Sequence, residues 1–473
     1  ITHMNFLQGQ RELPRRGWDF YHYYIGPKYF AELGHTGLYR AHTVADYEDD
    51  RESYHPEVWV RVLEDYSLTH KAIIVARREE VVAGFSPERW QEFKSDVGAF
   101  RHADFDVRQE PRWAQDHGYN GSPLTTVINR WLIHVLPFTV AEFVRVVSWF
   151  DLLLVVAAAL ITGRALGARW GLFSIIMFSL NPLNNYLTIG GSYLRYVHYV
   201  SLALGIVALL RGRNATSGVL FAISTHLRLF PVLLPLALFV GHLLSPERRS
   251  LLRARRSFYV SFAATGVLLL GLTSFVGVPG GEPVWKAFFE NSRLHSRVDS
   301  VNQVTLRYPF RYSEQANREV EQRTAKAIEW SAEIRRTFER NASWFYLAVT
   351  GFVALSIVFL RRVHRDEEAL FAGLVWLFAC THISVYDYLV LSVVPLIFYA
   401  DRRMWQLLTL SWIVIGAINF LPAARESMDW GYRAISIVVA IYFATALAVR
   451  AFAWRGPSAG ALPGTVAGTA LQE

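Results

Sequence analysis

Residues 257–278 read SFYVSFAATGVLLLGLTSFVGV, an uncharged and largely apolar stretch that directly follows Arg255 and Arg256. A helix needs roughly 20 such residues to cross a hydrocarbon core that is about 30 Å thick. Only helices and closed barrels satisfy all their backbone hydrogen bonds in lipid, and an unbroken apolar stretch is typical of a helix. The stretch therefore predicts a membrane-spanning helix.

Ten more apolar segments lie between Ala141 and Ala453, separated by short charged connections. Of the 473 residues, 52% are hydrophobic and 19% are charged, yet the mean hydropathy is only +0.20 because the region before Leu136 is polar. This mixture excludes a wholly soluble enzyme and a coiled coil. The eleven segments are 141–163, 170–188, 196–210, 214–227, 229–245, 257–278, 342–360, 367–382, 384–400, 405–422 and 432–453.

The net charge of +8 lies largely in the connections between these segments, which indicates membrane orientation and not nucleic-acid binding. Every second connection is rich in arginine, whereas the short connections of the other side hold only Arg195, Arg228 and Arg425. Positive residues favour the cytoplasmic side, so the first set marks the cytoplasmic face of an inner (cytoplasmic) membrane protein. Its sixteen members are Arg164, Arg169, Arg211, Arg213, Arg248, Arg249, Arg253, Arg255, Arg256, Arg361, Arg362, Arg365, Arg402, Arg403, Arg450 and Arg455.

We therefore predict an all-α, multi-pass membrane protein of about eleven transmembrane helices, with an α-rich first outer loop and a second outer loop. Because an odd number of spans leaves the two chain ends on opposite sides, we also expect one more helix before Ile1. The expected regions are an extracytoplasmic first loop with interfacial helices at 1–136, membrane helices at 137–278, an extracytoplasmic loop at 279–341, membrane helices at 342–453 and a disordered cytoplasmic tail at 454–473.

The first cluster of unusual residues on the outer side is WDFYHYYIGPKYFAELG at 18–34. Asp19 precedes a helical pattern that Gly34 ends, so it is either an N-cap or a general base. His22 lies one turn away on the same face. The many aromatic residues favour a helix at the membrane interface, which Pro27 is expected to kink.

The second cluster is QDHGYNGSP at 115–123, which precedes an amphipathic stretch. The composition suits a simple turn, with Ser122 and Pro123 at the start of a helix. Alternatively, Asp116 and His117 belong to the wall of a site, because this segment returns the chain to the membrane beside the first cluster.

A third group contains Arg195 and His198, and then His226 and Arg228, near the outer ends of apolar segments. Ionisable groups at such depth either extend to the interface or face a cavity or a polar headgroup. Arginine beside histidine suits a phosphate or pyrophosphate better than a neutral ligand.

The long outer loop brings three cations close together at Arg293, His295 and Arg297, which could clamp an anionic headgroup. Residues 285–290 predict a short interfacial helix, and residues 313–339 predict a separate, solvated charged helix. The last group is His382 with Asp387, in which the aspartate either caps a helix or orients a cation across the cavity.

Several motifs are missing from the sequence. There is no Walker loop, GxSxG elbow, HExxH motif or dinucleotide fingerprint followed by an acidic residue, so no ATP-driven machine is indicated and no cofactor is expected. Cys380 is the only cysteine, which excludes an intrachain disulfide and a zinc site built on several cysteines.

The arrangement resembles the GT-C class of integral membrane glycosyltransferases, in which a helical bundle carries an outer first loop with interfacial helices. In that class an aspartate soon after the first span is the base and the donor is a polyprenyl phosphate or pyrophosphate sugar, and the resemblance gives the aspartate's role to Asp19. The stretch HLRLFP at 226–231 is similar to a basic-residue-then-proline element of bacterial polyprenyl-phosphomannose-type transferases. Residues 291–297 and 382–389 resemble outer, periplasmic loop elements there.

The resemblance implies a direct displacement in which Asp19 accepts the proton of an acceptor hydroxyl and the sugar inverts. Arg228, Arg293 or Arg297 would stabilise the departing lipid phosphate. The chain departs from the class because its first span is not in the sequence and Asp19 has no DxD partner, which predicts a metal-independent enzyme. The expected partners are the lipid-linked donor and membrane lipid. The alternatives are a non-catalytic subunit of a larger membrane complex that keeps a GT-C-like fold, and a transporter, for which no inverted repeat is visible.

Overall fold

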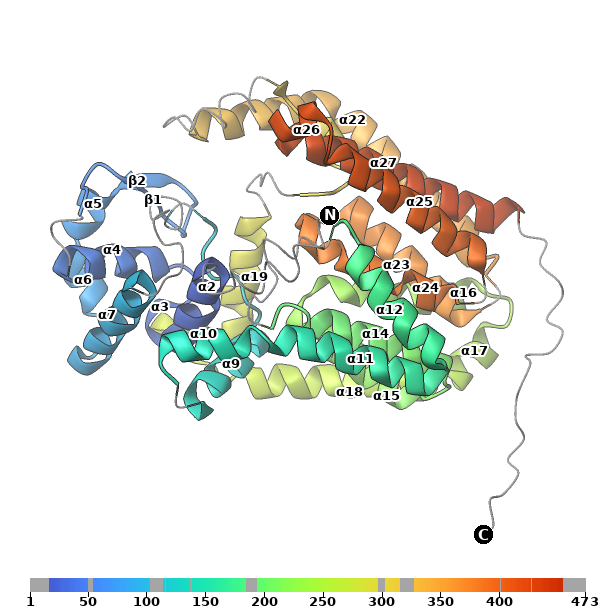
Figure 1. The fold of residues 1–473 in the computed structure, drawn as a ribbon, viewed down its shortest axis with the longest axis horizontal. Helices are drawn as coiled ribbons and strands as arrows, with labels where there is room; N and C mark the ends of the chain where they lie inside the picture. The colour runs from blue at the N-terminus through green and yellow to red at the C-terminus, as the bar shows by residue number, and fades with distance from the viewer. Residues whose placement is uncertain are drawn as a thin grey trace, which may run out of the picture.

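The computed structural model describes residues 17–49, 54–102, 114, 116–136, 138–183, 194–296, 303–314, 327–363, 365–399, 401–426 and 428–453. Within these ranges the chain is mostly helical, with one two-stranded antiparallel sheet, so the prediction of an all-α protein is confirmed. Figure 1 shows a mostly blue N-terminal unit at one end of a bundle of long helices.

The N-terminal unit packs its own hydrophobic core from large aromatic residues such as Tyr21, Phe30 and Phe93. In the same unit, the buried carboxylate of Asp46 forms salt bridges with Lys71 and Arg101 at 3.4 and 3.1 Å. These contacts tie three helices together. The elements of the unit are α2 (Gly17–Lys28), α3 (Phe30–Leu33), α4 (Leu38–Asp49), β1 (Trp59–Arg61), β2 (Leu68–His70), α5 (Lys71–Val75), α6 (Arg78–Val82), α7 (Pro87–His102), α9 (Pro123–Val135) and α10 (Val140–Val147).

Among the residues that the structure describes, each of the eleven predicted apolar segments contains helical residues, and most of them lie in the bundle. Its elements are α11 (Phe150–Leu166), α12 (Ala168–Leu180), α14 (Val197–Leu210), α15 (Asn214–Leu227), η3 (Phe230–Val232), α16 (Leu233–Leu244), α17 (Arg248–Ala254), α18 (Arg256–Thr273), α22 (Ala327–Leu360), α23 (Asp366–Cys380), η5 (Val385–Val393), α24 (Val394–Ile397), α25 (Arg402–Ile418), α26 (Pro422–Glu426), α27 (Met428–Ala448) and η6 (Val449–Ala453). Between α18 and α22 lie η4 (Pro279–Gly281), α19 (Val284–His295) and α20 (Tyr308–Arg311).

Four helices of the described chain are long and apolar enough to cross a membrane: Val140–Leu166, Arg256–Thr273, Ala332–Leu360 and Trp430–Phe452. Shorter apolar helices accompany them, and α14 and α15, at 14 residues each, reach only about 21 Å. Large apolar side chains such as Leu160 and Val267, which are 69% and 70% exposed, cover the outside of the bundle. Such a surface suits lipid and not water. The prediction of a membrane protein is confirmed, while the number of spans stays a prediction.

Small residues let the bundle helices approach closely. A Cβ added at Gly218 of α15 would lie 2.3 Å from the Phe258 carbonyl oxygen of α18, and one at Gly373 of α23 would lie 2.5 Å from the Leu233 carbonyl oxygen of α16. Glycine at these crossings is typical of helix packing in membranes.

Helix α9 joins the two parts of the molecule, because it packs against α2 on one side and against α15, α18 and α19 on the other. Ser122 is its N-cap and accepts a hydrogen bond from the Thr125 N–H at 3.2 Å, with Pro123 in the first turn. The predicted helix start at Ser122 and Pro123 is therefore confirmed.

Three local features differ from the predictions. The charged helix expected at 313–339 is not separate, because residues from Ala327 onward form the first turns of α22 and no helix breaker divides them from its apolar part. The described part of α2 begins at Gly17, so Asp19 lies inside the helix and not at its cap. The segment 384–400 is broken into the 3-10 helix η5 and the short α24, at whose start Pro395 lies.

Candidate functional site

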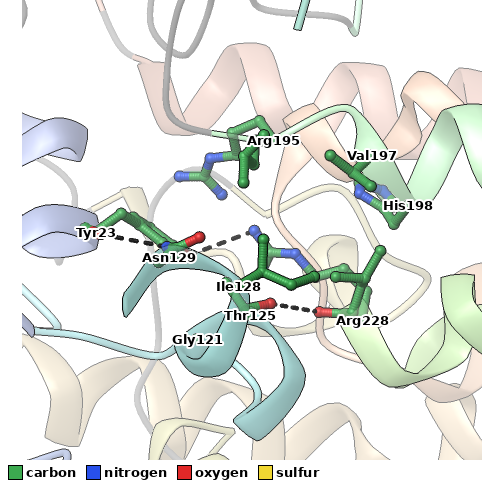
Figure 2. A pocket seen from close by; sticks show the side chains of 11 residues that line it. Tyr23, Gly121, Thr125, Ile128, Asn129, Arg195, Val197, His198 and Arg228 are labelled. Carbon is green, nitrogen blue, oxygen red and sulfur yellow. Dashed lines mark hydrogen bonds between the residues drawn. The ribbon is translucent and has the colours of Figure 1, made fainter. Parts of the chain in front are cut away.

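A narrow pocket opens where α9 meets the start of α14 and the end of α15. Its water-accessible space is about 20 Å³. This is room for about one water molecule, so a larger ligand engages the pocket at its mouth or widens it. Figure 2 shows the residues that line it, which include Tyr23, Thr125, Asn129, Arg195, His198 and Arg228.

Two arginines from different elements point toward Tyr23 in this pocket (Figure 2). Arg228 Nη2 lies 3.5 Å from the Tyr23 hydroxyl, and the Arg195 guanidinium lies 5.5 Å from the centroid of the Tyr23 ring. Tyr23 is itself held in place, because its hydroxyl donates to Asn120 Oδ1 at 2.9 Å and its carbonyl accepts from Asn129 Nδ2 at 3.2 Å. Tyr23 therefore couples the N-terminal unit to both arginines.

Asp151 of α11 holds the turn that carries Arg195. The buried carboxylate of Asp151 accepts the backbone N–H groups of Arg195 and Tyr196 at 2.8 and 3.1 Å. The preceding residue, Leu194, has a φ of 51°, a left-handed conformation that costs a non-glycine residue free energy. These contacts hold the arginine at the pocket despite that cost.

Asp387 of η5 and His198 of α14 complete the charged group around the pocket. Asp387 is buried, and the positive charges of Arg228 and Arg195 both act on its carboxylate. His198 is 3% exposed, and its Nε2 has no hydrogen-bond partner among the residues that the structure describes. Two guanidinium groups against one carboxylate favour an anionic ligand, and a planar guanidinium matches phosphate oxygens well.

A second group of polar side chains comes from the N-terminal unit and from α19. His117 Nδ1 is 3.2 Å from Asp116 Oδ1, and its ring lies 5.0 Å from that of His295 on α19. The Tyr66 hydroxyl is 3.3 Å from His295 Nδ1. Burial, with help from His117 and Arg228 and against Asp116, lowers the pKa of His295 to about 4, so this imidazole is neutral near pH 7. The predicted residues Asp116, His117 and His295 are thus brought together, within electrostatic range of Arg228.

Two predicted histidines support the site without lining the pocket. Gly118 N–H donates to the Tyr39 hydroxyl at 3.0 Å, and this hydroxyl in turn lies 2.7 Å from His22 Nε2, so His22 helps to hold the turn after Asp116. His226 Nδ1 donates to the Ala222 carbonyl at 2.8 Å, and its ring contacts Trp285 of α19. His226 therefore packs α15 against α19.

The remaining predicted residues lie elsewhere or outside the described part. Arg293 is exposed and lines a different cavity between the N-terminal unit and α19. His382 is half-buried, where its ring nitrogens lie 3.3 and 3.5 Å from Arg307 Nη1 and its Nδ1 lies 3.0 Å from the Ser296 carbonyl oxygen. Arg297 and the side chain of Asp19 lie outside the described residues.

Three functional candidates were not predicted from the sequence: Tyr23, Asn129 and Tyr66. A signal existed for Asn129, because it follows Thr125 by one helical turn on an otherwise largely apolar helix. Tyr23 was one aromatic residue among many in its segment, and nothing in the sequence linked Tyr66 to His295. Among the described residues no three histidine, cysteine or acidic side chains form a metal site, and metal independence stays a prediction.

The helical membrane bundle, with a basic pocket where it meets a polar unit, is the architecture of a GT-C-type membrane glycosyltransferase. The chain belongs to glycosyltransferase family 87, whose model matches residues 123–384, more than half of the sequence. The protein is therefore a transferase, and the GT-C resemblance is confirmed. A search of curated proteins and a search of solved structures each found no match.

The matched region runs from α9 to the residue before η5. It contains Arg195, His198 and Arg228, whereas Asp19 and Asp116 precede it. The basic side of the pocket thus belongs to the family region, and the side formed by α2 does not.

Proposed function

We propose that the protein transfers a sugar from a polyprenyl-phosphate-type lipid donor to an acceptor hydroxyl on the outer face of the inner membrane, with inversion at the sugar. The observation that carries this proposal is the convergence of Arg195 and Arg228 on one pocket at the ends of the short apolar helices α14 and α15. A lipid phosphate would reach such a position with its chain among the bundle helices.

The two arginines are suited to the leaving group. As the bond between the anomeric carbon and the phosphate oxygen breaks, negative charge grows on that oxygen. Arg195 and Arg228 would stabilise the departing polyprenyl phosphate, and Asp387 would keep the guanidinium groups oriented. The narrow pocket would hold the phosphate at its mouth.

We assign the base to Asp19. Position 19 is one helical turn before Tyr23 in α2, and Tyr23 contacts Arg228, so the two positions share the face of α2 nearest the arginines. The carboxylate would accept the proton of the acceptor hydroxyl while its oxygen forms the bond to the anomeric carbon. A single displacement of this kind inverts the sugar. The step needs no metal.

The orientation is argued from the arginine-rich connections. In Figure 1, α17 lies at the end of the bundle opposite the N-terminal unit, and it carries Arg248, Arg249 and Arg253. Since positive residues favour the cytoplasm, the N-terminal unit and the pocket would face outward and the C-terminus inward.

The experiment uses the purified full chain in lipid nanodiscs with synthetic polyprenyl-phosphate sugars and, separately, nucleotide sugars. We expect transfer from the lipid donor only, and loss of at least 99% of the rate in Asp19→Asn. The matched control is Glu79→Gln, an exposed carboxylate of α6 in the same unit, which should transfer at the wild-type rate. Transfer from a nucleotide sugar alone would overturn the donor assignment, and an active, folded Asp19→Asn would overturn the base.

A further inference from the structure

A second and much larger cavity lies between the N-terminal unit and α19, apart from the narrow pocket. Its volume is about 980 Å³, at the upper end of the range for small-molecule sites. Elements α3 to α6 form one wall, and η4 with α19 forms the other. In Figure 1, α19 is the yellow helix between the N-terminal unit and the bundle. We call this cavity the lateral cleft.

Three residues in the walls of the lateral cleft carry buried polar atoms that lack a hydrogen-bond partner within the described part of the chain. These atoms are Glu32 Oε2, His35 Nε2 and Asn291 Nδ2. His35 and Asn291 are 5% and 6% exposed. Leaving a buried polar atom without a partner is unfavourable, so three such atoms around one cleft favour a ligand that supplies the missing partners.

The contacts of His35 fix its tautomer. Nδ1 lies 3.2 Å from the Tyr119 carbonyl oxygen, which only accepts, so Nδ1 carries the proton and Nε2 is an acceptor. Burial lowers the pKa of His35 to about 4, against a smaller effect of the Tyr119 hydrogen bond, so the ring stays neutral. The ring also lies 6.0 Å from that of Phe288, and Asn291 follows Phe288 by three residues on the same face of α19.

The charge of the cleft disfavours an anion. Its described walls hold five glutamates and three arginines, and the Arg40 guanidinium is already paired with Glu64. Glu32 receives Arg89 on Oε1 at 2.7 Å, which leaves Oε2 as an acceptor. Two acceptors, Glu32 Oε2 and His35 Nε2, thus lie in the same cleft as one amide donor, Asn291 Nδ2.

Hydroxyl groups both donate and accept, so a polyhydroxylated neutral ligand satisfies all three atoms, and the ring of Phe85 offers it an apolar face. We propose that the lateral cleft binds a neutral saccharide. Its hydroxyls donate to Glu32 and His35 and accept from Asn291. The three atoms are buried, so their side chains would rotate toward the cleft when the saccharide binds, as side chains commonly do at binding sites.

Tyr119 and helix α19 each connect the cleft to the surroundings of the narrow pocket. The Tyr119 ring stacks on His35 on one side and lies 5.5 Å from the Tyr23 ring on the other. Helix α19 carries Asn291 in the cleft and, one turn later, His295 in the group around Asp116. The bound saccharide is therefore the acceptor of the transfer, an assignment that rests on the proposed function.

The first experiment measures binding without the donor. Saturation-transfer NMR on the full chain in nanodiscs uses a panel of neutral disaccharides and the matching uronic acids as probes. We expect signals from at least one neutral disaccharide, with at least tenfold weaker binding of its uronate. Ala287→Trp, which fills the cleft from α19, and Asn291→Leu should each weaken binding at least tenfold. Ala72→Trp, an exposed position of α5 outside the cleft, is the matched control and should bind as wild type.

The second experiment separates this proposal from the transferase mechanism. With a lipid donor, Ala287→Trp should raise the KM for the acceptor at least tenfold and leave the KM for the donor within twofold. Saccharide binding that Ala287→Trp abolishes, without any transfer from a lipid donor, would support the cleft and overturn the donor assignment. Normal transfer with an unchanged acceptor KM in Ala287→Trp, or binding that favours uronates, would overturn the lateral cleft as a neutral saccharide site.

Discussion

Replacing Arg228 by lysine should lower kcat/KM for sugar transfer about tenfold, while replacing it by methionine should lower this constant about 100-fold. Arg228 is half-buried beside Tyr23, and its charge acts on Asp387 and His295. Lysine keeps that charge but loses the planar, two-pronged geometry that binds phosphate oxygens. Methionine keeps the approximate length of the side chain and loses both charge and donors.

The size of the effect follows from the bonds at stake. A hydrogen bond to a charged group contributes about 1.5–3 kcal/mol, and each 1.4 kcal/mol corresponds to a factor of ten. Loss of one of two prongs in Arg228→Lys gives the tenfold estimate, and loss of both in Arg228→Met gives about 100-fold. Arg228→Met should also lower the stability of the fold. It removes one of the two arginine charges that act on the buried Asp387 carboxylate and leaves that of Arg195.

The assay is the initial rate of transfer in proteoliposomes as a function of donor concentration, with thermal unfolding measured on the same samples. Arg211→Lys and Arg211→Met are the matched controls, because Arg211 is an exposed arginine at the other end of α14. These controls should transfer at the wild-type rate. An Arg228→Met protein that is folded and no slower than Arg211→Met would refute a role of Arg228 in binding the leaving group.

Three further predictions concern stability, each measured by thermal or denaturant unfolding of the purified protein. Gly373→Ala forces a Cβ to within 2.5 Å of the Leu233 carbonyl and should cost about 1–3 kcal/mol, whereas Gly351→Ala, with nothing within 4 Å, should be neutral or slightly stabilising. Burial alone would raise the pKa of Asp46, but His42, Lys71 and Arg101 lower it to about 2, below an unfolded value near 3.9. Its contribution, on the order of 2 kcal/mol, is therefore complete above about pH 5 and lost as the pH falls through 4 toward 2, and Asp46→Asn should remove this dependence. Ser122→Ala removes the N-cap of α9 and should cost about 1 kcal/mol, and an unchanged midpoint would contradict the capping role.

The helical bundle could be predicted because its signal is local. Each apolar segment is recognisable from its own residues, and the bilayer fixes the length that a spanning helix needs. The bounds of α14 and α15 match the predicted segments 196–210 and 214–227 closely, whereas the segment 384–400 is broken into the short pieces η5 and α24. Protein neighbours replace lipid around such pieces, and this information is not in the segments themselves.

The charged residues of the pocket could be predicted for the same reason, since an arginine at the end of an apolar helix is conspicuous. The side chains that contact these charged residues could not be predicted from the sequence. Tyr23 lies 205 residues before Arg228, and only the packing of α2 on α9 brings the two together. The charged stretch 313–339 was interpreted wrongly because its composition suggested a separate solvated helix, whereas the continuity of α22 from Ala327 onward depends on the absence of a breaker.

The border of the family region suggests that donor binding and acceptor binding belong to different parts of the chain. The match begins at Pro123, the first residue of α9, so the arginines lie inside it and the N-terminal wall of the lateral cleft lies outside it. Helix α9 contacts both parts and contributes Thr125 and Asn129 to the pocket between them. If the donor is held by the family region and the acceptor by the N-terminal unit, acceptor specificity can change through residues before α9 while the phosphate site is kept. Exchanging residues lining the lateral cleft should then alter which saccharide is used and leave the donor KM unchanged.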